Sequence, residues 1–293
     1  MNGFLCVLKP PGMTSSDVVV RVRRKLGGRE KVGHAGTLDP EAAGVLPLMV
    51  GKAARLFDYI VEKEKRYVAQ LKPGYMTDTQ DAHGRITGGT GAQVSRAALE
   101  AVLPQFIGEI GQIPPMYSAL KRDGQKLCDL ARRGVAVQVQ PRPTQVFAID
   151  VLHEQPDGSF LLEIRCGRGT YIRTLCHDIG QALGCTAHMG MLLRTQTGIF
   201  TLEDARTIEE IDAADDLAPL MVPMDKPLAH LPRLDVAPRA ERFVRNGNVL
   251  TMRELSGSAP QNVPVRLYLN GQFCGIGRLH ENALKFDAML LEA

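Results

Sequence analysis

The sequence predicts an α+β protein that ends in a small β-rich unit. Short apolar or alternating segments predict strands, and longer segments with apolar residues three or four positions apart predict helices. Near the C-terminal end, Asn270 and Gly271 stand between two strand-like runs and predict a hairpin. The 293 residues suffice for one large domain and a small one.

The N-terminal segment predicts a buried strand over residues 4–8, followed by a turn and a helix. Thr14, Ser15 or Ser16 is expected to cap this helix, and the glycine pair at 27–28 is expected to end it. The apolar residues that it buries are predicted to be Val18, Val19, Val22 and Leu26. Arg21, Arg24 and Lys25 fall off the apolar face, which leaves them free to meet phosphates.

The stretch from Gly33 to Gly51 predicts a rigid, bent loop with one acidic group at its centre. Pro40 disfavours the helical conformation at Asp39, so this residue is expected on an extended or turn segment. The apolar run from Leu46 to Val50 anchors the loop to a core. Loops held in this way often carry chemistry, although a simple Asx-capped turn explains the composition equally well.

The rest of the chain alternates strands and helices up to a proline-punctuated linker at Pro219, Pro223 and Pro227. Strands are predicted at 65–71, 144–152, 160–165 and 192–195, and helices at 52–62, 95–106, 126–133, 170–184 and 203–213. Beyond the linker, strand-like runs at 263–269 and 273–279 indicate the small β-rich unit.

Composition narrows the class of protein. Hydrophobic residues make up 44% and charged residues 23%, as in ordinary globular proteins. There is no membrane-length apolar run and no signal peptide, so the expected compartment is the cytoplasm. The net charge of +3 is weak evidence for a polyanionic partner, but six basic residues and one acid lie between Arg21 and Lys31. Such a stripe fits phosphate contacts, and a solvated helix face fits it at least as well.

Asp39 is the first candidate for a catalytic group. A lone carboxylate in a glycine- and proline-rich loop suits a covalent nucleophile, provided that it stays ionised. An arginine within reach keeps such a carboxyl ionised, and Arg173, after a Gly-x-Gly turn at a helix start, is the best partner in the sequence. His34 suits either a general base or a polar group that fills a groove. Tyr67 suits stacking on a base, or a place half in the core.

Metal sites have weaker support. Cys176, His177, Cys185 and His188 do not follow the spacings of structural zinc sites, so no metal is predicted there. Asp78 and Asp81 together fit a cation site. Two solvated carboxylates on a loop are the simpler interpretation.

Six motifs occur together in one order. They are KPPGMTS (9–15), GHAGTLDPEAAGVLP (33–47), KRY (65–67), TDT (77–79), MYSALK (116–121) and GTYIRTL (169–175). Together they closely resemble the bacterial tRNA pseudouridine-55 synthases of the TruB family. The resemblance implies a mixed, mainly antiparallel central sheet flanked by helices, the pseudouridine synthase fold, with a catalytic domain over 1–226. It also implies a thumb-like insertion at about 118–145 and a small PUA-like RNA-binding domain over 227–293.

The same resemblance implies an activity: isomerisation of the T-loop uridine of tRNA to pseudouridine by base flipping, with no cofactor. By resemblance Asp39 is the nucleophile, Tyr67 stacks on the target base, and Arg173 pairs with Asp39. His34 takes the space of the flipped base, and Leu193 lines the pocket. The remaining substrate-binding residues expected from the motifs are Lys9, Gly36, Thr37 and Tyr171. The expected partner is the tRNA T stem-loop, and the expected state is a monomer that does not bind membranes.

Some positions depart from the family pattern. Residues 73–76 replace the more usual glycine-containing turn before Thr77, and His83 stands where the family often has Asp. The main alternative is a non-catalytic tRNA-binding protein or tRNA-folding chaperone, which needs the basic face and His34 but not Asp39. A hydrolase that uses His34 and Asp39 is more remote, because the chain has no nucleophile elbow.

Overall fold

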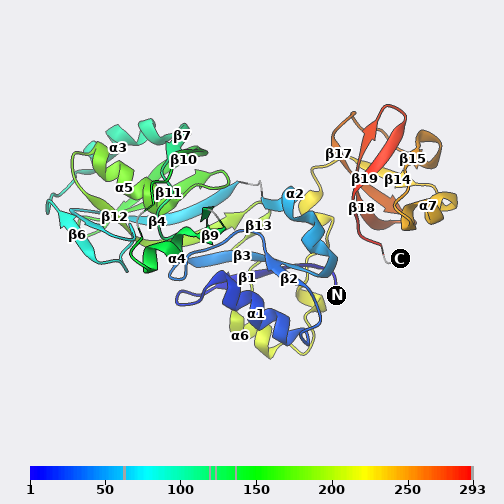
Figure 1. Ribbon diagram of the computed structural model, residues 1–293, viewed down its shortest axis with the longest axis horizontal. Coiled ribbons are helices and arrows are strands. Elements are labelled where there is room, and N and C mark those ends of the chain that lie inside the picture. The colour runs from blue at the N-terminus through cyan, green and yellow to red at the C-terminus, as the bar shows by residue number, and fades with distance from the viewer. Residues whose placement is uncertain (62–63, 119, 123, 136, 292–293) are drawn as a thin grey trace.

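The computed structural model describes residues 1–61, 64–118, 120–122, 124–135 and 137–291. These residues form a large sheet with helices packed on it and a separate small sheet near the C-terminal end (Figure 1). The prediction of an α+β fold with a mixed, mainly antiparallel central sheet and a β-rich C-terminal region is confirmed.

Within the described residues the central sheet has nine strands, and its main path runs β1-β3-β12-β4-β11-β10-β7. The bounds are Gly3–Lys9 (β1), Ala43–Val50 (β3), Ala187–Thr197 (β12), Lys65–Pro73 (β4), Phe160–Cys166 (β11), Arg142–Glu154 (β10) and Gly108–Gln112 (β7). Val32–His34 (β2) pairs with β3, and Phe200–Thr201 (β13) pairs with β12. Only β3 and β12 run parallel among these pairs, and their contact joins an early segment of the chain to a late one.

Helices bury one face of this sheet. They are Ser15–Lys25 (α1), Arg96–Val102 (α3) and Ile172–Ala182 (α5). Val22 of α1, Leu99 of α3 and Ile179 of α5 lie in one apolar cluster with strand residues such as Leu48 and Leu162. The cluster removes both the helix stripes and the sheet face from water, which is the main term that stabilises such a layered domain.

Helix ends follow their local signals with some differences from the predictions. Thr14 caps α1 with a reciprocal bond to Asp17, and Ser95 caps α3. The helix predicted over 52–62 is a 3-10 turn, Gly51–Leu56 (η1), followed by the short helix Phe57–Val61 (α2), and residue 62 lies outside the described residues. The acidic helix predicted over 203–213 spans only Ile208–Ala213 (α6). It begins there because Thr207 and Glu210 form a capping box.

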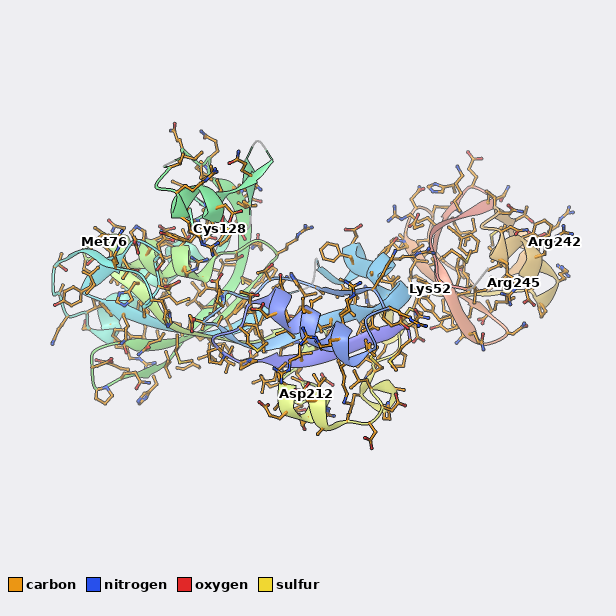
Figure 2. All side chains as sticks on the ribbon, turned by 60° about the horizontal axis from the view of Figure 1, so that its bottom comes forward. Lys52, Met76, Cys128, Asp212, Arg242 and Arg245 are labelled. Atoms are coloured by element: carbon orange, nitrogen blue, oxygen red, sulfur yellow. The ribbon has the colours of Figure 1, made fainter. Side chains whose placement is uncertain are left out.

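The prediction that Arg21 and Lys25 are free to meet phosphates is wrong. Arg21 forms a hydrogen-bonded ion pair with Asp212 of α6, and Lys25 Nζ donates to the Asp212 carbonyl oxygen at 2.7 Å. Figure 2 shows Asp212 on the segment that lies against α1. The acidic helix therefore neutralises part of the basic stripe, while Arg24 is exposed.

Smaller elements stand at the edge of the sheet domain. They are the hairpin Tyr75–Thr77 (β5) and Ile86–Gly89 (β6), the 3-10 turn Leu103–Phe106 (η2), and the pair Lys121–Arg122 (β8) and Gln125–Lys126 (β9) with the helix Leu127–Arg132 (α4). The segment that carries Cys128 of α4 rises from the body of the domain in Figure 2. It lies in the region predicted as a thumb-like insertion, of which residues 119, 123 and 136 lie outside the described residues.

The C-terminal unit is a six-stranded sheet in the described residues, in the order β15-β19-β18-β17-β14-β16. Its elements are Arg233–Val236 (β14), Glu241–Arg245 (α7), Leu250–Thr251 (β15), Leu255–Ser256 (β16), Pro264–Leu269 (β17), Gln272–His280 (β18) and Ala283–Met289 (β19). The predicted turn at Asn270 and Gly271 has φ of 51° and 78°, as a tight two-residue hairpin requires.

An apolar and hydrogen-bonded joint holds the C-terminal unit against α2 and the N-terminal strands. Ile276 and Leu290 share one buried cluster with Phe4 and Leu56. Lys52 Nζ, visible at this joint in Figure 2, donates to the Leu291 carbonyl oxygen at 2.6 Å. None of the helices in the described ranges is both long enough and apolar enough to cross a membrane.

Gly44 is required where β3 and β12 meet, and its replacement is expected to be costly. Its φ is 117°, and a Cβ there would lie 2.2 Å from the backbone oxygen of Arg194. We expect Gly44→Ala to lower the free energy of unfolding by about 3 kcal/mol or more, measured by urea denaturation. Gly158→Ala is the control, because Gly158 also has positive φ but open space, and it is expected to cost about 1 kcal/mol. Equal losses in the two variants would contradict the close approach.

Candidate active site

Asp39 lies in an irregular loop between β2 and β3, where the chain leaves one edge strand and enters a buried one. The Asp39 carbonyl accepts a hydrogen bond from Ala42 at 3.1 Å, which closes a turn around Pro40. The side chain is 34% exposed. The loop therefore presents a single carboxylate at the border between core and solvent.

Arg173 holds this carboxylate from the first turn of α5. Its Nε donates to Asp39 Oδ2 at 2.8 Å and its Nη2 donates to Asp39 Oδ1 at 3.0 Å, so the contact is bidentate. The remaining donors bind the carbonyl oxygens of Thr79 at 3.1 Å and Tyr117 at 2.9 Å. The Arg173 side chain is only 5% exposed. The predicted pairing of Asp39 with Arg173 is confirmed, with both carboxylate oxygens held by the guanidinium.

A second carboxylate, Asp81, approaches the same guanidinium, with its Oδ2 3.9 Å from Arg173 Nε. Asp81 accepts hydrogen bonds from Thr79 Oγ1 at 2.7 Å and from the backbone of His83 at 3.0 Å. These bonds hold the loop whose Thr79 carbonyl binds Arg173. Asp81 is thus part of the network that positions the arginine, a role that the sequence analysis did not assign to it.

Three buried side chains from distant parts of the chain hold the backbone on either side of Asp39. Arg194 of β12 donates to the carbonyl oxygens of Gly36 at 3.1 Å and Thr37 at 3.3 Å. Ser15 of α1 both donates to the Leu38 carbonyl and accepts from the Leu38 amide, at 3.0 and 2.8 Å. Lys9 of β1 donates to the Pro40 carbonyl at 2.8 Å. The loop is therefore fixed at consecutive residues without belonging to a helix or a sheet.

The expectation that Lys9 binds substrate does not fit its position. Its side chain has no exposed surface, and the ammonium donates to the carbonyl oxygens of Pro10, Met13 and Pro40 at 2.6 to 2.8 Å. Burial lowers the pKa of Lys9 to about 8, against the raising effect of the Glu41 and Asp39 carboxylates. All three donors are used within the protein, so Lys9 supports the loop from beneath.

Tyr67 lies on β4, where it pairs with Arg194 of β12 on one side and Ile164 of β11 on the other. It is 6% exposed and belongs to the same apolar cluster as Leu38. Burial raises the pKa of the Tyr67 phenol, while the neighbouring Arg194 guanidinium lowers it. The ring is therefore close to the Asp39 loop and is a neutral phenol at neutral pH.

His34 ends β2, opposite Leu48 of β3. The ring is half-buried, and its Nδ1 is buried without a hydrogen-bond partner among the described residues. Burial lowers the pKa of His34, and the positive charge of Arg194 lowers it further. A neutral ring fits the groove-filling alternative, since a protonated imidazole is disfavoured in this setting.

Tyr171 stands at the N-terminal end of α5, two residues before Arg173. The Gln112 side chain bridges its backbone, accepting from the amide at 2.9 Å and donating to the carbonyl at 3.2 Å. Burial raises the pKa of the half-buried Tyr171 phenol. The charges of Arg173 and Asp39 both act on this phenol, so Tyr171 lies within the same site.

On β12 the structure places Leu192, and not the predicted Leu193, on the side of the Asp39 loop. Leu192 is 7% exposed and belongs to the cluster that contains Tyr67 and Leu38, whereas Leu193 is half-buried and lies outside that cluster. Successive strand residues point to opposite faces, so Leu192 and Arg194 share the face of the Asp39 loop. Gly36 and Thr37 lie in that loop as predicted, with their carbonyl oxygens bound to Arg194.

The residues considered for metal binding have other roles in the structure. Cys176 is fully buried in α5, and burial raises the pKa of its thiol to about 12. His188 Nδ1 lies 2.9 Å from the Tyr75 carbonyl oxygen. Asp78 accepts from the backbone and side chain of Arg85, at 2.9 and 3.3 Å. These groups support their own loops and are not aimed at a common point.

The arrangement is suited to nucleophilic chemistry by one carboxylate. Arg173 fixes both oxygens of Asp39, while a third of the Asp39 side chain still meets solvent. An aromatic ring and apolar side chains lie beside it on β4 and β12. Sequence reasoning missed Arg194 and Ser15. A charged residue in the otherwise apolar run of β12 was the available signal for Arg194.

Two family models match the chain. The model described as "TruB family pseudouridylate synthase (N terminal domain)" matches residues 23–172. The model described as "tRNA pseudouridylate synthase B C-terminal domain" matches residues 173–229. The first match contains the Asp39 loop and Tyr67, and the second begins at Arg173.

Curated relatives and solved structures agree with these models. A tRNA pseudouridine synthase B from Alkaliphilus oremlandii is 42% identical over 94% of this chain and 93% of its own length. A protein of the same name from Dechloromonas aromatica is 40% identical over 100% of this chain and 96% of its own. A Cbf5-Nop10-Gar1 complex contains a chain with a TM-score of 0.73 and 27% identity, over 99% of this chain and 84% of that chain.

The contributions of Asp39 and Arg173 to the free energy of unfolding should be coupled. Arg173 is buried, so water cannot replace Asp39 as its hydrogen-bond partner. We expect Arg173→Met to lower the free energy of unfolding by about 2 kcal/mol, a value below that of a fully buried pair because Asp39 is partly exposed. Asp39→Asn combined with Arg173→Met should cost about 1 kcal/mol less than the sum of the single changes, measured by urea denaturation.

The exposed pair Arg96–Glu100 is the matched control for that cycle, with a nitrogen–oxygen distance of 2.7 Å. Its coupling is expected to be at most about 0.5 kcal/mol, since both side chains lie in water. Strictly additive effects at Asp39 and Arg173 would contradict the proposed dependence of one on the other.

Proposed function

The chain belongs to the TruB family of pseudouridylate synthases, and from the geometry of its site we propose that it isomerises the T-loop uridine of tRNA, position 55, with Asp39 as nucleophile. At the coarser level it is a tRNA pseudouridine synthase and therefore an isomerase. The observation that carries the finer proposal is the bidentate contact of Arg173 with a partly exposed Asp39.

The reaction balances without any external reagent. The glycosidic bond between N1 of uracil and C1′ of ribose breaks, the detached ring turns, and a bond forms between C5 and C1′. The C5 hydrogen leaves as a proton and N1 takes up a proton, so no electrons are gained or lost. Only a nucleophile, a proton acceptor and a site that retains the ring are needed, which this chain can supply from its own side chains.

Asp39 supplies the nucleophile in this proposal, by attack on either the uracil ring or C1′ of the ribose. Its oxygens are oriented by Arg173, so the carboxylate reaches the reacting carbon with little loss of rotational freedom. Arg173 is buried and cannot itself follow the substrate. Its role is to keep Asp39 ionised and aimed.

Base flipping is the second part of the proposal. A uridine inside a folded RNA loop must leave its stack before its glycosidic bond is reached, at a cost of a few kcal/mol. Stacking on Tyr67 and occupation of the vacated space by the neutral His34 ring offset this cost. Leu192, together with Leu38 and Tyr67, keeps water from the detached uracil.

The tRNA contacts follow from charge and position. We propose that the chain binds the T stem-loop as a monomer. The segment at about 118–145 acts as a thumb over the RNA in this proposal. A catalytic domain over 1–226 is followed by a PUA-like unit over 227–293. The exposed Arg132 at the end of α4 and Arg133 directly after it suit phosphate contacts that position the RNA without reading its sequence. Tyr171 and the Gly36–Thr37 backbone lie beside Asp39, where the flipped nucleotide would be held.

The decisive experiment measures isomerase activity and its position together. Unmodified tRNA transcript with tritium at C5 of uridine should release tritium with the wild-type protein, and carbodiimide-blocked primer extension should map the product to one T-loop uridine. Asp39→Asn should release no tritium above background, because the amide is a poor nucleophile, while its tRNA affinity stays within about threefold of wild type.

The exposed Asp150→Asn serves as the control and should behave as wild type. Full activity of Asp39→Asn would remove Asp39 from the nucleophile role. If the wild-type protein and both variants bind tRNA tightly but none of them releases tritium, the result would instead favour the tRNA-folding chaperone.

A further inference from the structure

Arg194 is the largest side chain in the described residues that is almost completely buried, at 1% exposure. It stands on β12 in a run that is otherwise apolar on this face, beside Leu192. A buried guanidinium is costly unless its donors are used, and a leucine or methionine would pack on this strand at lower cost. The retention of a charge here therefore needs a reason.

The hydrogen bonds of Arg194 give part of that reason. Its Nε donates to the Val45 carbonyl oxygen at 2.8 Å, and its two terminal nitrogens donate to those of Thr37 and Gly36. Gly36 and Thr37 precede Asp39, and Val45 follows it on β3. One planar group thus spans both arms of the loop that carries the nucleophile, with its donors on three nitrogens held in a fixed geometry that a lysine lacks.

No carboxylate is among these hydrogen-bond partners, so backbone carbonyl groups solvate the charge at the loop. The charge consequently acts on the ionisable groups around it. Burial lowers the pKa of His34 and the Arg194 charge lowers it further, whereas burial raises the pKa of Tyr67 and Arg194, its partner across β12 and β4, opposes that rise. Three ionisable groups act on the Tyr67 phenol: Arg194 on β12, Cys166 on β11 and Asp39 in the loop. Of these only Arg194 favours the phenolate form.

We infer that Arg194 is a positioning residue of the isomerisation: its guanidinium locks the Gly36–Thr37 backbone to β12 and orients the Tyr67 phenol toward the nucleotide beside Asp39. The inference deepens the proposed function and rests on it for the catalytic consequence. The nucleophile comes from the loop between β2 and β3, and the aromatic ring comes from β4. Arg194 hydrogen-bonds the backbone of that loop and stands opposite Tyr67 in the pairing of β12 with β4.

The first test measures Tyr67 itself and needs no turnover. With carbon-13 at Cζ of tyrosine, the Tyr67 signal is assigned by its loss in Tyr67→Phe, and its titration is followed in wild type, Arg194→Lys and Arg194→Met. Arg194→Met should raise the titration midpoint of Tyr67, because the only favourable charge is removed. Arg194→Lys keeps a charge and should move it less.

The second test measures turnover by tritium release. A loss of alignment of the order of 1 Å reduces rates by about a hundredfold, so kcat of Arg194→Met should fall about 100-fold while KM changes less than threefold. Arg194→Lys should fall about tenfold, because one nitrogen holds only part of the loop. The exposed Arg96→Lys is the control and should match wild type.

A combined variant guards against misfolding. A thermal unfolding curve shows whether Arg194→Met is folded. If it is not, Arg194→Lys is combined with Tyr67→Phe. The loss of kcat in this double variant should be smaller than the product of the losses in the two single variants. An unmoved Tyr67 titration in Arg194→Lys and Arg194→Met, or fully multiplicative effects on kcat, would reduce Arg194 to a structural residue. A wild-type protein that lacks activity but shows the Tyr67 shift would overturn the proposed function and leave the contact intact.

Discussion

The loop around Asp39 has irregular backbone next to a core, and the need to satisfy its buried carbonyl groups organises much of the structure. Strand pairing ends at His34 and resumes at Ala43, so no ladder is available in between. Arg194, Ser15 and Lys9 supply the missing hydrogen bonds from β12, α1 and β1. Because an unpaired buried backbone group costs as much as a lost hydrogen bond, these three contacts also fix which strands must be neighbours. The parallel pairing of β3 with β12 brings Arg194 to the loop.

Charge in the site is distributed unevenly. Lys9, Arg173 and Arg194 are buried cations that surround the loop, while Asp39, a third exposed, is the acid in direct contact with one of them. The cations differ in their partners: Lys9 and Arg194 bind carbonyl oxygens, and only Arg173 grips the carboxylate. Asp39 thus lies among buried positive groups, whereas burial keeps His34 and Tyr67 neutral at neutral pH. Such a division suits a site in which one anion reacts and the rings beside it pack against a base.

The strands and the capped helices could be predicted from local signals such as a cap, a glycine turn or a helix start. The Asp39–Arg173 pair joins distant segments, for which spacing offered only a candidate partner, and its prediction came from the resemblance to the TruB family. Errors arose where tertiary contacts decide. The register of β12 is interrupted between Met189 and Leu192, so the inward leucine is Leu192 and not Leu193. Lys9 carries a motif but turns inward to three carbonyl oxygens. The pairing of Arg21 with Asp212 joins residues 191 positions apart, beyond the reach of any helical spacing rule.

The C-terminal unit is connected to this site through packing. Ala35 and Val45, which flank the Asp39 loop, lie in the same buried cluster as Ile276, Ala288 and Leu290 of the small sheet. Arg55 and Tyr59 add polar contacts across the joint, to the Met289 carbonyl and to the Asp287 carboxylate. An interface with an apolar centre and satisfied polar groups at its border resists relative rotation of two units. RNA held by the C-terminal unit would thus be placed at a fixed distance from Asp39, and the same cluster that supports the nucleophile loop sets that distance.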